Sequence, residues 1–439
     1  MILKQRDKQI PSIALPAIVT NITVPLLGLI DTAIVGHLGD ASYIGAIAVG
    51  AMIFNLIYWM FGFLRMGTSG MTAQAHGRRD MTEICSLLRN SLLQSFSIAL
   101  LLLLLQWPLC ELMLWLLGPT PDVRPLTAAY FYIVVWGAPA SLGLFSLTGW
   151  FIGMQNTVIP MQVSILQNIS NIIMSLFFVY VLGMKIEGVA LGTVIAQYTG
   201  LLVAIVLLWR NYRRLWKKSR QQTTYNSHHA SLTTFFRVNR DIFLRTCCLV
   251  AVNLAFTALG ARQGATILAV NALLMQLYLL FSYVLDGFAY AGEALGGRYW
   301  GAQDGAAFRD VVNRLFRWGA LMTVFFTAVY IFGGTPFLRL LTDEPGVIEA
   351  SSDYIWWAYL IPIAGVAAFI WDGIFIGTTQ TRGMLLSACI AACTFFGIVV
   401  GLTGLLGNHA LWLAQVLFLT VRGAVQTIIY ATQLQKTAS

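Results

Sequence analysis

The sequence predicts an all-α integral membrane protein, with twelve transmembrane helices arranged as two six-helix bundles. Of its 439 residues, 58% are hydrophobic and only 10% are charged, whereas an ordinary soluble protein carries about 25% charged residues. Apolar stretches recur along the whole chain, and the two halves resemble each other. The net charge of +9 could suggest nucleic-acid binding. We prefer a different explanation, because Lys and Arg also accumulate in the cytoplasmic loops of membrane proteins.

A membrane-spanning helix needs about 20 predominantly apolar residues. Six stretches of the first half meet this requirement, at residues 10–35, 45–73, 86–117, 125–148, 158–183 and 187–210. Six more follow in the second half, at residues 241–261, 266–296, 310–340, 350–376, 384–406 and 410–434. We therefore expect an N-terminal lobe at 1–210, a basic cytoplasmic linker at 211–235 and a C-terminal lobe at 236–439.

The distribution of positive charges predicts the orientation of the chain. With the N-terminus inside, 21 of the 27 Lys and Arg residues fall on cytoplasmic segments and four on external ones, while Arg65 and Arg422 lie within spans. Because cytoplasmic loops are enriched in Lys and Arg, we expect both termini in the cytoplasm. No small-residue cleavage site precedes the first apolar run, so we interpret that run as a retained span.

An internal repeat relates the two halves at an offset of about 224 residues. Gly77-Arg-Arg-Asp80 corresponds to Gly301-Ala-Gln-Asp304, and Phe151-Ile-Gly153 to Phe375-Ile-Gly377. Since each unit has six spans, both enter the membrane from the same side, which predicts a pseudo-two-fold axis along the membrane normal. Parallel repeats of this kind are typical of secondary transporters. We expect no enzyme, because no Walker motif or catalytic constellation is visible.

Asp31 lies within the first predicted span. An isolated carboxylate there costs roughly 2.5–3.5 kcal/mol on insertion scales, and such residues are usually functional. Burial disfavours the charged form, so this carboxyl is a candidate for coupling proton flow to transport. Pro16 and Pro25 precede it, and each removes a backbone donor and bends a helix. Helix breaks are also common in membrane spans, so a purely structural role for the prolines stays open.

Three further acids of the second half lie within predicted spans: Asp286, Glu293 and Asp372. They could form a polar cavity that attracts cationic substrate or relays protons. The alternative is structural pairing with arginines, or the end of a span near the cytosol. The candidate arginines are Arg65, Arg298 and Arg422.

Polar residues also line one face of the predicted fifth span. Asn168, Asn171 and Ser175 are spaced three and four residues apart, which places them on the same side of a helix. Thr193 of the sixth span could meet them. Interhelical hydrogen bonding and participation in an ion site are equally compatible with this pattern.

The six cysteines lie mostly in apolar segments, and no His or acid accompanies them at the spacing of metal ligands. We therefore expect them to pack as small apolar residues. No cofactor is expected, apart from the coupling ion.

Several segments resemble the MATE family of multidrug and toxic compound extrusion transporters, and specifically its DinF-type branch. The resemblance covers nearly the whole chain. Its most specific segments are residues 21–38, 64–77, 269–275, 285–290, 372–377 and 407–414.

The resemblance implies a twelve-helix exporter with two lobes that works by rocker-switch antiport in the bacterial inner membrane. It further implies that Asp31 is the main cation-coupling residue and that the first helix bends at Pro16. Asn171 and Thr193 would be the partners of Asp31, with Tyr130 as a further candidate.

One departure from the family pattern concerns the coupling ion. The family has an Asp four residues after the Asn of the fifth helix, whereas this chain has Ser175 four residues after Asn171. One negative charge therefore remains where a cation site would prefer two. We hypothesise that Asp31 acts alone and favours protons over sodium. It would form at most a weak monovalent cation site, and we expect no other metal.

These observations together predict a monomeric drug/proton antiporter in the lipid bilayer that exports small organic compounds, which we expect to be cationic. No nucleic-acid partner is expected. Two alternatives stay open, a Na⁺-coupled drug antiporter and a flippase for lipid-linked saccharides. A flippase would be expected to carry more basic residues in its spans than Arg65 and Arg422, because a pyrophosphate headgroup is anionic.

Overall fold

The computed structural model describes residues 2–36, 41–222 and 232–434, and nearly all of them are helical. Eleven helical stretches in this part of the chain are long and apolar enough to cross a membrane. A further long helix, α1 (Ile2–Gly36), covers the first predicted span. The all-α architecture predicted from the sequence is confirmed, and the helix count agrees with twelve spans.

The helices of the first half follow the predicted spans closely. They are α2 (Ala41–Met60), α3 (Phe63–Arg78), α4 (Met81–Leu104), α5 (Gln106–Leu117), α6 (Val123–Val134), η1 (Val135–Gly137), α7 (Ala138–Gly153), α8 (Val158–Leu176), η2 (Phe177–Val181) and α9 (Ile186–Gln222). Helices α2 and α3 form one span in two pieces, as do α6, η1 and α7.

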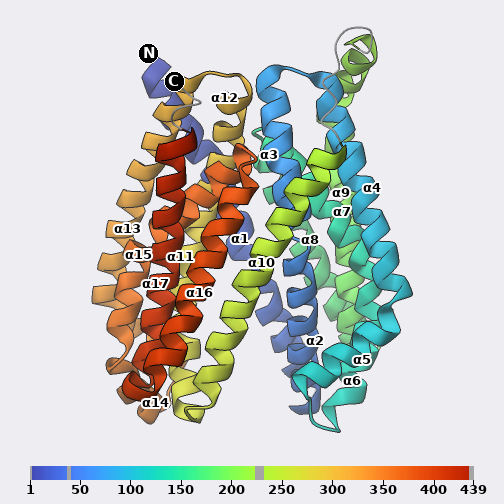
Figure 1. The fold of residues 1–439 in the computed structure, drawn as a ribbon. Coiled ribbons are helices and arrows are strands. Elements are labelled where there is room, and N and C mark those ends of the chain that lie inside the picture. Colours follow the sequence, from blue (N-terminus) through green and yellow to red (C-terminus); the bar gives the residue numbers. More distant parts are fainter. Residues whose placement is uncertain (1, 37–40, 223–231, 435–439) are drawn as a thin grey trace. The chain divides into compact units, whose positions relative to one another are not determined.

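The helices of the second half show the same agreement. They are α10 (Leu232–Ala261), α11 (Ala265–Ala291), η3 (Gly292–Gly296), α12 (Gly297–Gly301), α13 (Gly305–Leu341), α14 (Pro345–Ser352), α15 (Ile355–Gly377), α16 (Thr381–Leu406), α17 (Asn408–Ile429) and η4 (Tyr430–Leu434). Figure 1 shows α13, α15 and α17 in this half, where α15 packs against both neighbours.

The predicted span at 86–117 is wrong at its end. The spanning helix α4 stops at Leu104, and α5 is a separate short helix. Pro108 explains the break, because proline lacks an N–H group and clashes with the carbonyl four residues earlier. Helix α5 exposes Trp107 and Trp115 at 67% and 76%, which is typical of a segment at a membrane–water interface.

The predicted linker at 211–235 is partly helical. Helix α9 continues through the basic stretch to Gln222, and α10 begins at Leu232. The intervening residues of the predicted linker, 223–231, lie outside the described residues.

The chain divides into two compact units. The N-terminal unit comprises Val19–Ser231, and the C-terminal unit comprises Met1–Ile18 together with Leu232–Ser439. The first half of α1 therefore belongs to the C-terminal unit, whereas the sequence predicts it in the N-terminal lobe at 1–210. Its residues Ile10 and Ala14 are fully buried, so burial of apolar surface against the C-terminal helices stabilises this arrangement. Helix α1 passes from one unit to the other between Ile18 and Val19.

The internal repeat is visible in the turns. Among residues 2–36, 41–222 and 232–434, four residues other than glycine have positive φ, and they form two pairs 224 residues apart, Arg79 with Gln303 and Gln155 with Thr379. Such backbone conformations are uncommon for residues with a side chain. Their recurrence at equivalent positions therefore supports the repeat predicted from the sequence.

Close helix contacts recur at the same offset. A Cβ on Gly149 would lie 2.2 Å from the carbonyl oxygen of Arg65, and a Cβ on Gly373 would lie 2.2 Å from that of Ala289. Glycine is thus required where α7 approaches α3 and where α15 approaches α11. Small residues at helix contacts are typical of membrane proteins.

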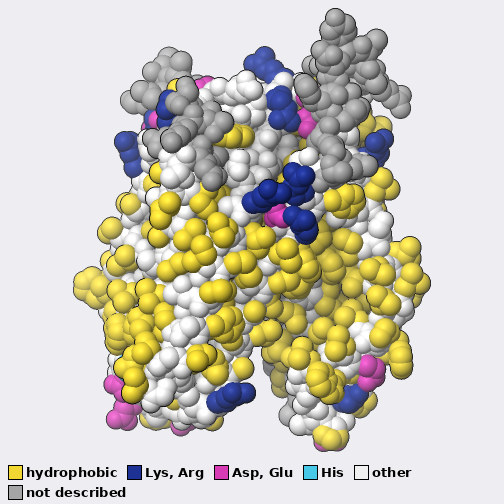
Figure 2. Space-filling view, in the orientation of Figure 1, with side chains coloured by type: hydrophobic (Ala, Val, Ile, Leu, Met, Phe, Trp, Pro, Cys, Tyr) yellow, Lys and Arg dark blue, Asp and Glu magenta, His cyan; other side chains and the backbone are white. Residues whose placement is uncertain are grey.

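Hydrophobic side chains cover the middle of the helices on the face drawn in Figure 2, and most charged side chains lie toward the helix ends. Phe332 and Val400 are 83% and 85% exposed. Apolar exposure of this extent is stable in contact with lipid but not with water. The protein is therefore a multi-pass membrane protein.

Candidate functional site

Asp31 lies in the second half of α1, within the N-terminal unit. Only 7% of the residue is exposed, and its Oδ1 atom has no hydrogen-bond partner among the described residues. No charged group among the described residues offsets the cost of burying this carboxylate. An isolated buried carboxylate is costly unless it takes up a proton or binds a cation.

Tyr130 of α6 lies near this acid. Its phenol is within electrostatic range of Asp31 and hydrogen-bonds with Thr193 of α9. The ring is 4% exposed and occupies the space beside Gly50 of α2, where a Cβ would lie 2.4 Å from it. The absence of a side chain at Gly50 therefore allows Tyr130 to reach the acid.

Asn171 of α8 completes this group. Its Nδ2 donates to Oγ1 of Thr193 at 3.1 Å, and Thr193 donates in turn to the carbonyl of Val189. The Oδ1 atom of Asn171 is buried and unpaired in the described structure. The sequence-predicted residues Asp31, Tyr130, Asn171 and Thr193 thus supply both donors and unused acceptors in one unit, and we call them the acid pocket.

Ser175 is fully buried one turn beyond Asn171, and its Oγ has no partner in the described structure. A Cβ on Gly192 of α9 would lie 2.4 Å from that oxygen. The position at which the family has a carboxylate therefore packs closely against the neighbouring helix.

Asn168 of α8 and the two prolines of α1 are the remaining residues predicted for this site. Asn168 donates to the carbonyl of Thr23 at 3.0 Å and so attaches the second half of α1 to α8. Pro16 lies two residues before the point at which α1 leaves the C-terminal unit. The side chain of Pro25 lies outside the described residues.

The half-buried Tyr58 and the buried Gln197 are polar residues beside the acid pocket that are absent from the predicted set. Tyr58 of α2 lies within electrostatic range of Tyr130, and Gln197 lies one turn beyond Thr193 on α9. The Tyr58 hydroxyl lies within interaction range of the side chains of Gln197 and Ser141. The helical spacing from Thr193 is a signal that could have identified Gln197.

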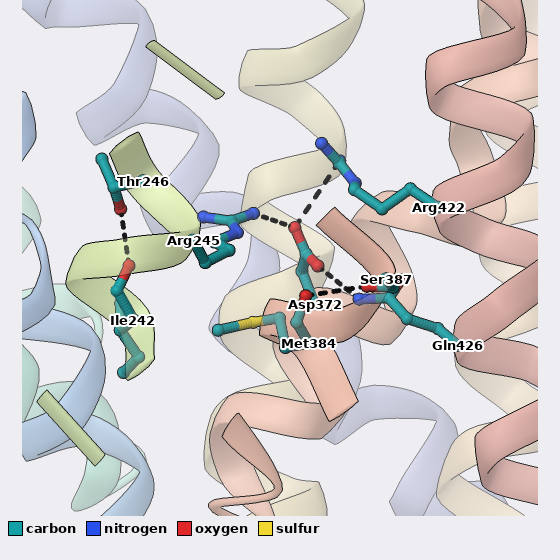
Figure 3. Close-up of polar contacts among 8 residues, drawn as sticks. All are labelled: Ile242, Arg245, Thr246, Asp372, Met384, Ser387, Arg422 and Gln426. Carbon is teal, nitrogen blue, oxygen red and sulfur yellow. Dashed lines mark hydrogen bonds and ion pairs between the residues drawn. The ribbon is translucent and has the colours of Figure 1, made fainter. Parts of the chain in front are cut away.

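The C-terminal unit holds a second buried acid in a different environment. Figure 3 shows Arg245 of α10 and Arg422 of α17 pointing toward Asp372 of α15 from opposite sides. Arg245 donates to Oδ2 of Asp372, Arg422 lies 3.5 Å from the same oxygen, and Gln426 donates to Oδ1 at 2.7 Å. Asp372 is therefore neutralised and hydrogen-bonded on both oxygens.

Arg245 is a residue that sequence reasoning misplaced. Arg245 is near the start of the predicted span at 241–261 and is one of the 21 charges counted as cytoplasmic, but it is 6% exposed and lies within a membrane-spanning stretch. Its ion pair with Asp372 offsets the cost of burial. Arg422 is one of the three arginines proposed above as structural partners.

Two further acids of the predicted polar cavity lie in this unit. Asp286 is partly buried and lies within electrostatic range of Arg245, the arginine that also pairs with Asp372. Glu293 is 1% exposed and belongs to the π-helical turn η3. The polar cavity of Asp286, Glu293 and Asp372 stays a prediction.

A helical membrane protein built from two repeats, with a buried acid that lacks a charged partner among the described residues of one unit and a neutralised acid in the other, has the features of a secondary transporter. The MatE family model matches residues 16–177 and 242–403, once in each half of the chain. The chain therefore belongs to the MATE family, which consists of transporters rather than enzymes.

Individual relatives agree with this assignment. The DNA damage-inducible protein F of Escherichia coli is 38% identical, over 96% of this chain and 91% of the relative. The probable multidrug resistance protein NorM of Acinetobacter baylyi is 23% identical, over 88% and 86%. The crystal structure of the Vibrio cholerae MATE transporter VcmN in the bent form has a TM-score of 0.85 at 18% identity, covering 99% of this chain and 98% of that one.

Proposed function

We propose that this protein exports organic compounds across the membrane in exchange for protons, by alternating access. The observation that carries the proposal is the environment of Asp31, a buried carboxyl without a charged partner in the described structure. Such a group can be stabilised in the membrane by taking up a proton and can release it when the pocket is hydrated.

The acid pocket supports a simple transport cycle. In the outward-facing state the carboxyl of Asp31 accepts a proton, and its electrostatic interaction with Tyr130 changes accordingly. The second half of α1 then rearranges and displaces the substrate. In the inward-facing state the proton leaves, and the negative carboxylate favours loading of a new substrate. Pro16 is well located for bending, because it lies close to the point where α1 leaves one compact unit.

The substrates we propose are small organic cations. A carboxylate in a pocket of low polarity favours positive charge, and the A. baylyi relative is described as a probable multidrug resistance protein. Positively charged drugs would compete with the proton for the same acid, which is the basis of antiport.

We prefer protons to sodium because Ser175 supplies no second carboxylate. Sodium is held by several oxygen ligands, and a proton needs only one. Asn171 and Thr193 still offer oxygen atoms, so a weak sodium site at Asp31 remains the competing hypothesis and the test below separates the two.

We further propose a bacterial inner-membrane location with both termini in the cytoplasm and a monomeric functional unit. The excess of Lys and Arg on one side of the predicted spans supports the orientation. A bacterial relative at 38% identity supports the location.

The proposal can be tested with purified protein in vesicles that contain a fluorescent cationic dye. We expect a proton gradient to drive dye transport, a sodium gradient to have little effect, and Asp31→Asn to abolish transport. Asp122→Asn, at an exposed position, serves as the matched control and should transport normally. Transport that follows the sodium gradient alone would contradict proton coupling, and full activity of Asp31→Asn would contradict the assigned acid.

A further inference from the structure

A groove on the surface of the C-terminal unit lies between α13 and the packed pair α15 and α17. Its volume is about 810 Å³, which is within the range of roughly 300–1,000 Å³ for ligand sites. The lining residues that matter here are Phe316, Arg317, Ala320, Trp371, Thr427 and Tyr430. Arg317, Ala320 and Thr427 are exposed, so the groove opens outward from the helices.

The exposed side chains of α13 show the depth of this groove in the bilayer. Large apolar residues face outward from Leu321, at 54% exposure, to Leu340, at 81%. At 1.5 Å per residue, this stretch is about 30 Å long, which equals the hydrocarbon thickness of a membrane. Arg317 lies one turn before Leu321 on the same face. Its Cα is therefore about 6 Å beyond the apolar stretch, at the depth of lipid headgroups.

The wall of the groove is aromatic. The rings of Phe316 and Trp371 are 4.9 Å apart, and those of Trp371 and Tyr430 are 4.5 Å apart. Trp and Tyr are enriched where hydrocarbon meets the headgroup region. Trp371 is 3% exposed and forms the floor of the groove, and the half-buried rings of Phe316 and Tyr430 beside it can contact the upper part of an acyl chain.

The polar end of the groove is positively charged. Arg317 forms neither an ion pair nor a hydrogen bond with any described residue. Arg309 lies about two helical turns earlier on α13 and within electrostatic range of Tyr430. Guanidinium groups recognise phosphate through paired N–H donors, so the charge complements a phosphodiester.

We propose that this groove is a binding site for one anionic phospholipid, with its phosphate on Arg317 and an acyl chain against the wall of Phe316, Trp371 and Tyr430. Basic pockets between transmembrane helices are recognised sites for such headgroups. The lipid site is separate from the acid pocket, and it does not depend on what the protein transports.

The groove is coupled to the interior of the unit through two adjacent contacts. Trp371 donates to Oγ1 of Thr427 at 2.8 Å on the groove side, and the next residue, Asp372, accepts from Gln426 on the buried side. A lipid that packs on Trp371 therefore supports the contact of α15 with α17. We expect it to stabilise the C-terminal unit.

The test is native mass spectrometry of the full-length protein in detergent, titrated with phosphatidylglycerol or phosphatidylcholine. We expect one phosphatidylglycerol to bind preferentially and to raise the unfolding temperature. Arg317→Ala should weaken binding about fivefold, the effect of losing one Arg near an anionic headgroup. Ala320→Trp should fill the groove and abolish binding.

Arg339→Ala is the matched control, because Arg339 is exposed on the same helix at the other end of the apolar stretch. It should bind phosphatidylglycerol as the wild type does. Equal affinity of Arg317→Ala and Arg339→Ala, or equal binding of the two lipids by the wild type, would overturn the proposal. If Ala320→Trp does not fold, the comparison of the two arginine variants decides alone.

Discussion

Asp372 and Gln426 are joined by a hydrogen bond of 2.7 Å between α15 and α17, in the buried part of the C-terminal unit. Because Arg245 also donates to Asp372, this acid has partners for its charge and for both oxygens. Asp31 has no comparable partners in the described structure. We therefore assign structural support to Asp372 and coupling to Asp31.

Replacement of Asp372 by Asn should destabilise the protein more than it impairs coupling. The change removes the carboxylate that pairs with Arg245 and Arg422, and breaking a buried ion pair typically costs about 3–5 kcal/mol. Thermal unfolding in detergent should show the loss, and the double variant Asp372→Asn with Arg245→Gln should recover part of it. An Asp372→Asn protein with normal stability and no proton-driven transport would contradict this assignment.

Thr193→Val removes the hydroxyl that accepts from Asn171 and leaves a buried donor unpaired. An unpaired buried group typically costs about 1–3 kcal/mol, and the arrangement around Asp31 should change with it. We expect the pH for half-maximal dye transport to shift while substrate binding is retained. Thr199→Val on the same helix is the control and should leave the pH profile unchanged. Identical shifts in both variants would indicate a general effect on α9.

Ser175→Asp restores the second carboxylate of the family pattern. Two acids in one pocket hold sodium more strongly than one, because each adds oxygen ligands and charge. We expect dye transport by this variant to become responsive to a sodium gradient, although close packing against Gly192 should lower its stability. Ser175→Asn, of similar size but neutral, should remain insensitive to sodium. Sodium dependence in both variants would show that charge is not the cause.

Gly192→Ala should loosen the contact between α8 and α9. The added Cβ would lie 2.4 Å from Oγ of Ser175, and overpacking of this kind typically costs about 1–3 kcal/mol. Gly401→Ala is a suitable control, because nothing lies within 4 Å of its Cβ position. The first variant should unfold at a lower temperature than the wild type and the second should not.

The sequence predicts the architecture well because membrane burial imposes long apolar helices and because the repeat constrains both halves. Arg79 and Gln303 lie in the matched segments at 77–80 and 301–304, so the repeat predicts that their turns are equivalent. Arg245 could not be placed in the same way, since a charge near the end of an apolar stretch can face either solvent or a buried acid. The packing of Ile10 and Ala14 with the C-terminal helices could not be predicted either, because chain order does not determine which compact unit a helix joins.

Within the acid pocket, the contact of Asn171 with Thr193 agrees with the predicted pairing of polar faces. Gln197 was missed, although its spacing of four residues from Thr193 places it on the same face of α9. The groove beside Trp371 could not be predicted either, since it depends on how three helices diverge.

Proton release on substrate binding is the most direct test of the central claim. Purified protein in weakly buffered solution with a pH indicator would be mixed with a cationic dye, and the protons released would be counted. We predict about one proton released per dye bound by the wild type and by Asp122→Asn, and none by Asp31→Asn. Proton release by Asp31→Asn equal to that of the wild type would contradict the assignment of Asp31 as the coupling acid.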